Sequence, residues 1–162
     1  MTTSPRRSWS IALFAAFAVL SAQSISSAQQ KPAAVKPLLT VYKTPTCGCC
    51  SKWVDHMRAN GFDAKVHDLS DLTEIKTKLG VPAELGSCHT AQVGRYVIEG
   101  HIPADAVHRL LKERPTTVTG LAVPGMPLGS PGMEVPGGSA DPYLILTFDR
   151  KAQTTVFERR PR

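Results

Sequence analysis

Three of the four cysteines of this chain fall within four consecutive positions, Cys47-Gly48-Cys49-Cys50, and the fourth is Cys88. Cys47 and Cys50 have the C-x-x-C spacing of a redox dithiol. A dithiol uses two sulfurs, whereas a site for a soft metal ion uses three or four. The additional sulfur of Cys49 therefore favours metal binding. Thiol–disulfide oxidoreduction by Cys47 and Cys50 stays as the alternative.

The spacing of the cysteines favours copper among the soft metals. Thiolates select Cu(I), Zn(II) or iron–sulfur clusters, and structural zinc prefers two paired cysteine knuckles, which this spacing does not form. Successive helical residues differ in direction by roughly 100°, so Cys49 and Cys50 cannot easily reach one ion. They can reach different ions if their sulfurs bridge, and thiolate bridging suits Cu(I). The pattern therefore predicts a copper site with room for more than one ion.

Other side chains are candidates for accessory ligands. His89 adjoins Cys88 and offers a ring nitrogen, with a surface imidazole as the alternative. Met126 and Met133 offer thioether sulfurs, with simple packing over the site as the alternative. Trp53 is predicted to lie in the core. The remaining histidines are predicted to lie on the surface: His56, His67, His101 and His108.

The N-terminus has the pattern of a secretory signal peptide. Arg6 and Arg7 supply the positive region, and residues 11–20 form an apolar run. That run is shorter than the roughly 20 residues that a membrane span needs. Ser26 and Ala28 provide small residues at a cleavage site. The pattern therefore predicts a periplasmic protein with no stable membrane anchor, and an uncleaved anchor is the alternative.

The domain organisation follows from this pattern. We predict a signal peptide at 1–28, a flexible leader at 29–36 and one domain at 37–162. Four cysteines in an exported protein also suggest two structural disulfides. That interpretation is weaker, because a bridge between cysteines so close in sequence constrains little of the unfolded chain.

The charge of the chain does not indicate a nucleic-acid partner. The net charge is +6, and removing Arg6 and Arg7 leaves +4. The basic residues form no dense cluster and do not alternate with aromatic residues, as they do on nucleic-acid surfaces. We therefore expect ordinary surface solvation and no nucleic-acid binding.

The elements that must position the cysteines are predicted from apolar periodicity and turn residues. Strands are expected at 38–42, 62–69, 89–93 and 96–99, and helices at 50–60, about 70–80 and 103–113. This order is typical of a thioredoxin-like α/β domain, with a central mixed sheet and flanking helices. A long Gly/Pro-rich loop at 115–140 is predicted to form an ordered flap. A C-terminal hairpin is expected from 143–148 and 154–157.

A thioredoxin-like domain predicts that all four cysteines meet. The C-x-x-C would begin the first helix, where free N–H groups and the helix dipole favour a thiolate at Cys47. The loop before the third strand faces that position in this fold, and here it contains Cys88 and His89. The fold assignment therefore predicts that the sulfur of Cys88 approaches those of the other three cysteines.

Three motifs together resemble one family. The runs TPTCGCC (44–50), SCHT (87–90) and MPLGSPGME (126–134) are similar to those of the periplasmic copper-resistance proteins called CopG. The resemblance covers essentially the whole chain after the signal peptide. It implies a thioredoxin-like fold, a role in copper resistance and a cysteine-bridged multinuclear copper cluster. The matching thiolate positions are Cys47, Cys49, Cys50 and Cys88, and a histidine ligand would correspond to His89.

The leading functional hypothesis is a periplasmic copper-binding protein that lowers copper toxicity. Such a protein would hold Cu(I), pass it to copper-export or copper-chaperone proteins, or cycle it between Cu(I) and Cu(II). The motifs leave open whether it is an oxidoreductase or only stores and transfers copper.

Overall fold

The computed structural model describes residues 1–2 and 35–160. Residues 3–28 of the predicted signal peptide (1–28) and most of the predicted leader (29–36) lie outside these residues. Among the residues that the structure describes, no helix combines the length and apolar character needed to cross a bilayer.

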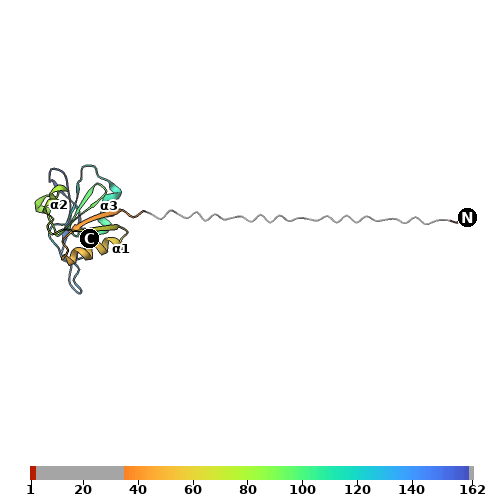
Figure 1. The fold of residues 1–162 in the computed structure, drawn as a ribbon, viewed down its shortest axis with the longest axis horizontal. Helices are drawn as coiled ribbons and strands as arrows, with labels where there is room; N and C mark the ends of the chain where they lie inside the picture. The colour runs from red at the N-terminus through yellow and green to blue at the C-terminus, as the bar shows by residue number, and fades with distance from the viewer. Residues whose placement is uncertain (3–34, 161–162) are drawn as a thin grey trace. The chain divides into compact units, whose positions relative to one another are not determined.

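Seven strands form one mixed sheet in the order β2-β1-β3-β4-β5-β6-β7 (Figure 1). The bounds are β1 Leu38–Lys43, β2 Asp63–Asp68, β3 His89–Val93, β4 Tyr96–Glu99, β5 Gly120–Ala122, β6 Tyr143–Phe148 and β7 Thr154–Arg160. The β1–β2 and β4–β5 pairs are parallel, and the other neighbours are antiparallel. The predicted α/β class with a central mixed sheet is confirmed, while the closer assignment to a thioredoxin-like fold stays a prediction.

The helices cover both faces of the sheet. Their bounds are α1 Gly48–Ala59, α2 Thr73–Lys78 and α3 Ala104–Glu113, with a short 3-10 helix, η1, at Ala83–Leu85. One core cluster joins buried residues of α1 and α3 to β1, β3 and β4, and Ile98 belongs to it. A second, smaller cluster contains Val97 and Leu85. Because successive strand residues point to opposite faces, α1 and α3 cover one face and the α2–η1 segment covers the other.

The register of β1 against β3 positions the cysteine-bearing segments. Lys43, the last residue of β1, lies opposite His89, the first residue of β3. The segment leading to Cys47 leaves the sheet at this end, and Cys88 enters it at the same end. Two segments about 40 residues apart in sequence thus meet at one end of the central strands.

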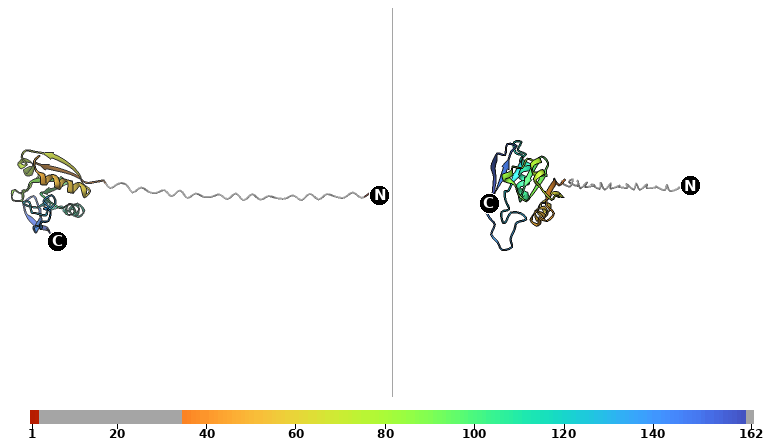
Figure 2. Two further views of the ribbon diagram at one scale, coloured as in Figure 1. Left: turned by 90° about the horizontal axis from the view of Figure 1, so that it is seen from below. Right: turned by 60° about the vertical axis from the view of Figure 1, so that its left-hand side comes forward.

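The predicted Gly/Pro loop at 115–140 differs from the structure in one respect, because it contains strand β5. This strand pairs with β4 and with β6, so the C-terminal hairpin extends the main sheet and lies at its edge (Figure 2). A Cβ atom on Gly120 would lie 2.2 Å from the carbonyl oxygen of Val97, so only glycine allows this close pairing. A three-residue strand that depends on tertiary pairing has too short a pattern to be recognised in sequence.

Candidate metal centre

The C-x-C-C run begins helix α1, as predicted. Cys47 is the N-cap residue, and its sulfur accepts a hydrogen bond from the backbone N–H of Cys50 at 3.3 Å. The cap places Cys47 beside the free N–H groups at the positive end of the helix. Cys50 lies within the first turn and is fully buried. Cys49 projects from the same turn and is partly exposed.

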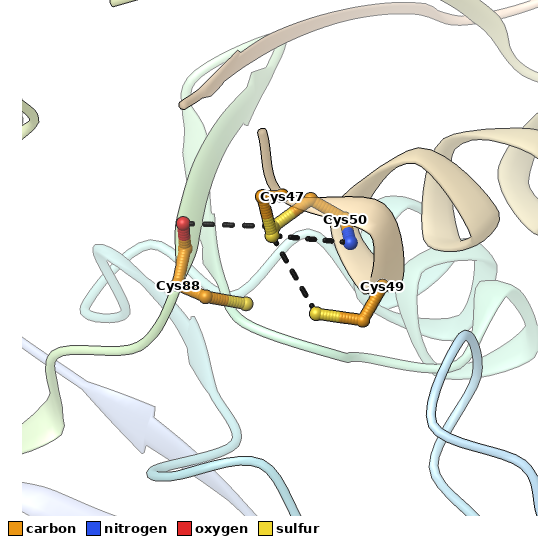
Figure 3. Close-up of side chains that lie close together, drawn as sticks. All are labelled: Cys47, Cys49, Cys50 and Cys88. Carbon is orange, nitrogen blue, oxygen red and sulfur yellow. Dashed lines mark hydrogen bonds between the residues drawn. A yellow bond between two sulfur atoms is a disulfide. The ribbon is translucent and has the colours of Figure 1, made fainter. Parts of the chain in front are cut away.

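The four cysteines converge. Their sulfur atoms all lie within 4.8 Å of one another (Figure 3). Cys47 and Cys50 form a disulfide, and the sulfur of Cys49 lies 3.5 Å from that of Cys47. Cys88 approaches from the loop before β3, and its carbonyl oxygen lies 3.7 Å from the sulfur of Cys50. Cys88 therefore lies close to the other three cysteines, as its predicted position in the loop before the third strand requires.

A second group of ligand atoms shares Cys88. It consists of Cys88, His89 and His101, whose ligand atoms also lie within 4.8 Å of one another. The sulfur of Cys88 lies 3.0 Å from Nε2 of His101 and 3.4 Å from Nδ1 of His89. Both imidazoles are fully buried. Sulfur and nitrogen donors therefore form one continuous site, with Cys88 at the junction.

The prediction that His101 lies on the surface is wrong. The reason is the register of the β3–β4 hairpin, in which Thr90 pairs with Glu99 and Val93 with Tyr96. The hairpin brings the residues that follow Glu99 beside those that precede Thr90, and Nε2 of His101 lies 3.0 Å from the sulfur of Cys88. The signal was therefore present in the sequence, because the turn at Gly94 and Arg95 fixes which residues face each other. His89 is buried as well, so its alternative interpretation as a surface imidazole is also wrong.

The ring of His101 is oriented toward Cys88 by a second contact. Its Nδ1 lies 2.8 Å from the carbonyl oxygen of Pro131, so Nδ1–H donates to that oxygen. Nε2 then carries the lone pair, and it is the atom that faces the sulfur of Cys88. Metal-binding histidines are commonly oriented in this way by a carbonyl that accepts from the other ring nitrogen.

The ring of His89 is held differently. It packs against Trp53, with 4.3 Å between ring centroids, and against His101, with 4.9 Å. Its Nε2 is buried and has no hydrogen-bond partner among the residues that the structure describes. Buried polar atoms in folded proteins are usually satisfied, so this free nitrogen fits a group that binds something other than protein.

Burial favours the neutral forms of the Cys88 thiol and of the imidazoles of His89 and His101. It raises the pKa of the Cys88 thiol to about 12, with the nearby Cys49 adding to the shift. It lowers the pKa of His101 and places that of His89 well below its ordinary value. The imidazoles are therefore unprotonated at neutral pH and free to bind a metal, whereas a metal must displace the proton of Cys88.

These shifts predict a loss of stability in acid for the metal-free protein. The ordinary histidine pKa is 6.5, and the folded values of His89 and His101 are lower. Below pH 6.5 the unfolded chain therefore binds more protons than the folded one, so the free energy of unfolding falls as the pH decreases from about 7 to about 5. Urea unfolding at several pH values measures this slope.

The variant His101→Gln isolates one contribution to that slope. It is expected to show a shallower loss of unfolding free energy toward low pH than the unmodified chain, because one buried imidazole no longer has to be protonated. His67→Gln, at an exposed position, controls for the removal of an imidazole elsewhere. An equal slope for His101→Gln and the unmodified chain would contradict the prediction.

The predicted flap covers part of the site. Gly132 packs on α1, where a Cβ atom would lie 2.6 Å from the carbonyl oxygen of Cys49 and 2.9 Å from the amide nitrogen of Trp53. The neighbouring Pro131 contacts His101. Met133 is half-buried in the same turn, where its N–H donates to Ser130, and Met126 is 52% exposed. Ligand roles for the two methionines stay predictions.

The remaining aromatic and histidine predictions can be compared with the structure. Trp53 is fully buried, as predicted, and its indole N–H donates to the carbonyl oxygen of Ile102 at 2.8 Å. His67 and His108 are exposed, as predicted. His56 is half-buried instead, because its Nε2 accepts a hydrogen bond from Ala104 N at the start of α3.

An α/β domain that gathers four sulfurs and two buried imidazoles at one end of its sheet has the composition of a soft-metal-binding protein. The comparisons specify the family. Residues 85–133 match the family model described as protein of unknown function, DUF411. No curated protein matches the chain.

Two solved structures of copper resistance protein CopG, forms 1 and 2, match the chain at 38% and 39% identity, each with a TM-score of 0.73. Each match covers 78% of this chain and 99% of the other. The chain therefore belongs to the CopG family of copper resistance proteins. Together with the cysteine cluster, this membership supports a copper-related role.

Proposed function

We propose that this chain is a periplasmic copper-binding protein that holds Cu(I) in a thiolate-bridged site and thereby lowers copper toxicity. The observation that carries the proposal is the convergence of four cysteine sulfurs within 4.8 Å. Thiolates are the donors that favour Cu(I). A group this compact places each sulfur close enough to its neighbours for one sulfur to contact two ions.

The proposed donors are of two chemical kinds, sulfur and nitrogen. Cys47, Cys49, Cys50 and Cys88 supply the sulfurs, and the neutral imidazoles of His101 and His89 supply nitrogens beside Cys88. Cys88 belongs to both groups, so it is the donor best placed to join ions held on either side. Met126 and Met133, on the flap, are proposed as weaker thioether donors.

The disulfide sets a condition for full loading. While Cys47 and Cys50 are joined, only Cys49 and Cys88 are free thiols among the described residues. Two electrons and two protons convert the disulfide into two thiols, and copper binding then releases protons from them. The protein is therefore proposed to take its full complement of Cu(I) only in the reduced form.

The proposed location and partners follow from the N-terminal pattern and the cargo. Residues 1–28 are proposed as a secretory signal peptide, followed by a leader at 29–36 and the metal-binding domain at 37–162. Copper-export or copper-chaperone proteins are the proposed partners, because a protein that holds copper in the periplasm must receive it and release it.

The first test is an anaerobic titration of the reduced chain with Cu(I) against a chromophoric chelator. We expect tight binding of two or more ions per chain, because four neighbouring thiolates can share their sulfurs between Cu(I) ions and two imidazoles add further donors beside Cys88. Binding of one ion or none would contradict the proposed cluster.

A second candidate function is thiol–disulfide oxidoreduction by Cys47 and Cys50. The disulfide between these two residues, at the N-terminus of a helix, favours it. This function predicts turnover in an insulin-reduction assay and gives no role to Cys49, Cys88 or the two buried histidines. The copper proposal predicts that thiol reactivity is lost once Cu(I) is bound.

The variant Cys49→Ala separates the two functions. A copper cluster is expected to lose at least one Cu(I) per chain, because one of four sulfurs is removed. A dithiol enzyme would retain most of its activity, since Cys47 and Cys50 are intact. Copper stoichiometry and insulin reduction are measured on the same preparation. An unchanged stoichiometry would count against the cluster.

A further inference from the structure

The side chain of Glu99 is fully buried, yet it belongs to neither group of candidate ligands. Glu99 is the last residue of β4, and its carboxylate lies on the face of the sheet that α2 covers. It forms an ion pair with Lys76 of α2, whose side chain is 19% exposed. A buried ion pair rarely contributes more stability than apolar residues of similar size, so its presence calls for another role.

The hydrogen bonds of Glu99 surround the Cys88–His89 dipeptide. Oε1 accepts from the backbone N–H of Ser87 at 2.6 Å, and Oε2 accepts from the hydroxyl of Thr90 at 2.6 Å. Lys76 also donates to that hydroxyl, at 2.9 Å. Ser87 and Thr90 are the residues directly before and directly after the dipeptide. One carboxylate therefore holds both of its ends.

Alternation along β3 places the side chains of His89 and Thr90 on opposite faces of the sheet. His89 packs against Trp53 of α1, whereas Thr90 binds Glu99 and Lys76 on the opposite face. Glu99 and Lys76 thus reach the Cys88–His89 dipeptide through its neighbours Ser87 and Thr90, and neither residue belongs to a group of candidate ligands.

Two further contacts limit where Cys88 can move. The hydroxyl of Ser87 donates to the carbonyl oxygen of Gly125 at 2.7 Å, and Gly100 N donates to the carbonyl oxygen of His89 at 3.0 Å. Gly100 has a φ of +74°, and a Cβ atom there would lie 2.6 Å from the Ser87 hydroxyl oxygen. Glu99 is the charged member of this arrangement and the one that reaches both sides of the dipeptide.

We propose that Glu99, paired with Lys76, is a positioning residue that holds Cys88 and His89 in the geometry that copper binding requires. The proposal rests on the proposed copper-binding function and adds to it a residue that touches neither metal nor ligand atom. The dipeptide is positioned by the hydrogen bonds that the Glu99 side chain forms with Ser87 and Thr90, and not by its negative charge.

Two substitutions distinguish the effect of the length of the Glu99 side chain from the effect of its negative charge. Glu99→Gln removes the charge but keeps the length of the side chain. Its amide oxygen can accept from Ser87 N–H, and its NH2 group can donate to the hydroxyl oxygen of Thr90. Glu99→Asp keeps the charge and withdraws the carboxylate by one methylene, away from Ser87 and Thr90. If positioning matters, Glu99→Asp weakens Cu(I) binding by about tenfold or more, whereas Glu99→Gln weakens it by less than about threefold.

The measurements are Cu(I) affinity by chelator competition and the alkylation rate of Cys88 in the reduced, metal-free chain. Leu110→Ala, in the core and absent from the ligand groups, serves as a destabilised control whose melting temperature is compared with those of the Glu99 variants. We expect Leu110→Ala to bind Cu(I) as the unmodified chain does, and Glu99→Asp to alter the alkylation rate of Cys88 where Leu110→Ala does not.

The outcomes are distinct. Weaker binding in Glu99→Gln than in Glu99→Asp would overturn positioning in favour of an electrostatic role. If Glu99→Asp and Leu110→Ala have the same melting temperature and weaken Cu(I) binding equally, Glu99 contributes only to stability and the proposal is wrong. Failure of the unmodified chain to bind Cu(I) would instead overturn the proposed function, and Cys88 alkylation would still report on positioning.

Discussion

Replacing Cys88 with alanine is expected to remove most Cu(I) binding. Cys88 is the one residue that belongs to both groups of ligand atoms, the four sulfurs and the pair of imidazoles. Without its sulfur, the two groups have no shared donor, and ions on either side lose a ligand at once. We expect the bound copper to fall by at least one ion per chain. The affinity of what remains should fall by about a hundredfold, or about 2.8 kcal/mol.

The same substitution should leave the fold intact, because Cys88 is only partly buried and lies in a loop before β3. Circular dichroism and urea unfolding of the metal-free variant verify this. Cys88→Ser is the matched control, since it keeps the size of the side chain but replaces a soft donor with a hard one. We expect Cys88→Ser to bind Cu(I) as poorly as Cys88→Ala. Tight binding by either variant would show that Cys88 is not a ligand.

Gly132→Ala is expected to have the second largest effect. Gly132 has a φ of +86°, which costs an alanine about 1–2 kcal/mol. Its Cβ atom would also lie 2.6 Å from Cys49 O and 2.9 Å from Trp53 N, and overpacking of this kind costs about 1–3 kcal/mol. We therefore expect the free energy of unfolding to fall by about 2–5 kcal/mol. Copper affinity should fall as well, because the neighbouring Pro131 orients His101.

Gly137→Ala provides the matched control on the same flap. Gly137 has a φ of +74°, but a Cβ atom there would meet nothing within 4 Å. Its expected cost is therefore the backbone strain alone, about 1–2 kcal/mol, with copper affinity unchanged. Urea unfolding and Cu(I) competition on both variants give the comparison. Equal effects on stability and on affinity would show that the flap does not press against α1.

The elements that could be predicted are those with a local pattern. Helix α1 follows from the spacing of Trp53, Val54 and Met57 on one face, and the Asn60-Gly61 pair indicates where it ends. The approach of Cys88 followed from the order of elements, because adjacent central strands bring their ends together. Strand β5 could not be predicted, since three residues between turns form a strand only when β4 and β6 accept their hydrogen bonds.

His101 shows the limit of reading single residues. Taken alone, an isolated histidine is predicted to lie on the surface, and this prediction is wrong for His101. Its burial depends on a pairing between two strands and on a flap about 30 residues further along the chain. Glu99 was overlooked for the same reason, because its partners Lys76 and Ser87 come from different elements. The burial and contacts of such residues can be predicted only after the pairing of the two strands has been predicted.

The flap is tethered at both ends to neighbouring strands, because β5 ends at Ala122, β6 begins at Tyr143 and the two strands pair. A loop closed in this way can lift from α1 without separating any strand pair. Opening of this loop would then be a local event with a smaller free energy than global unfolding. A ligand held beneath the loop could leave without unfolding of the domain. A ligand that binds only when the loop is closed would stabilise the closed form by mass action. A bound ligand would therefore slow its own release.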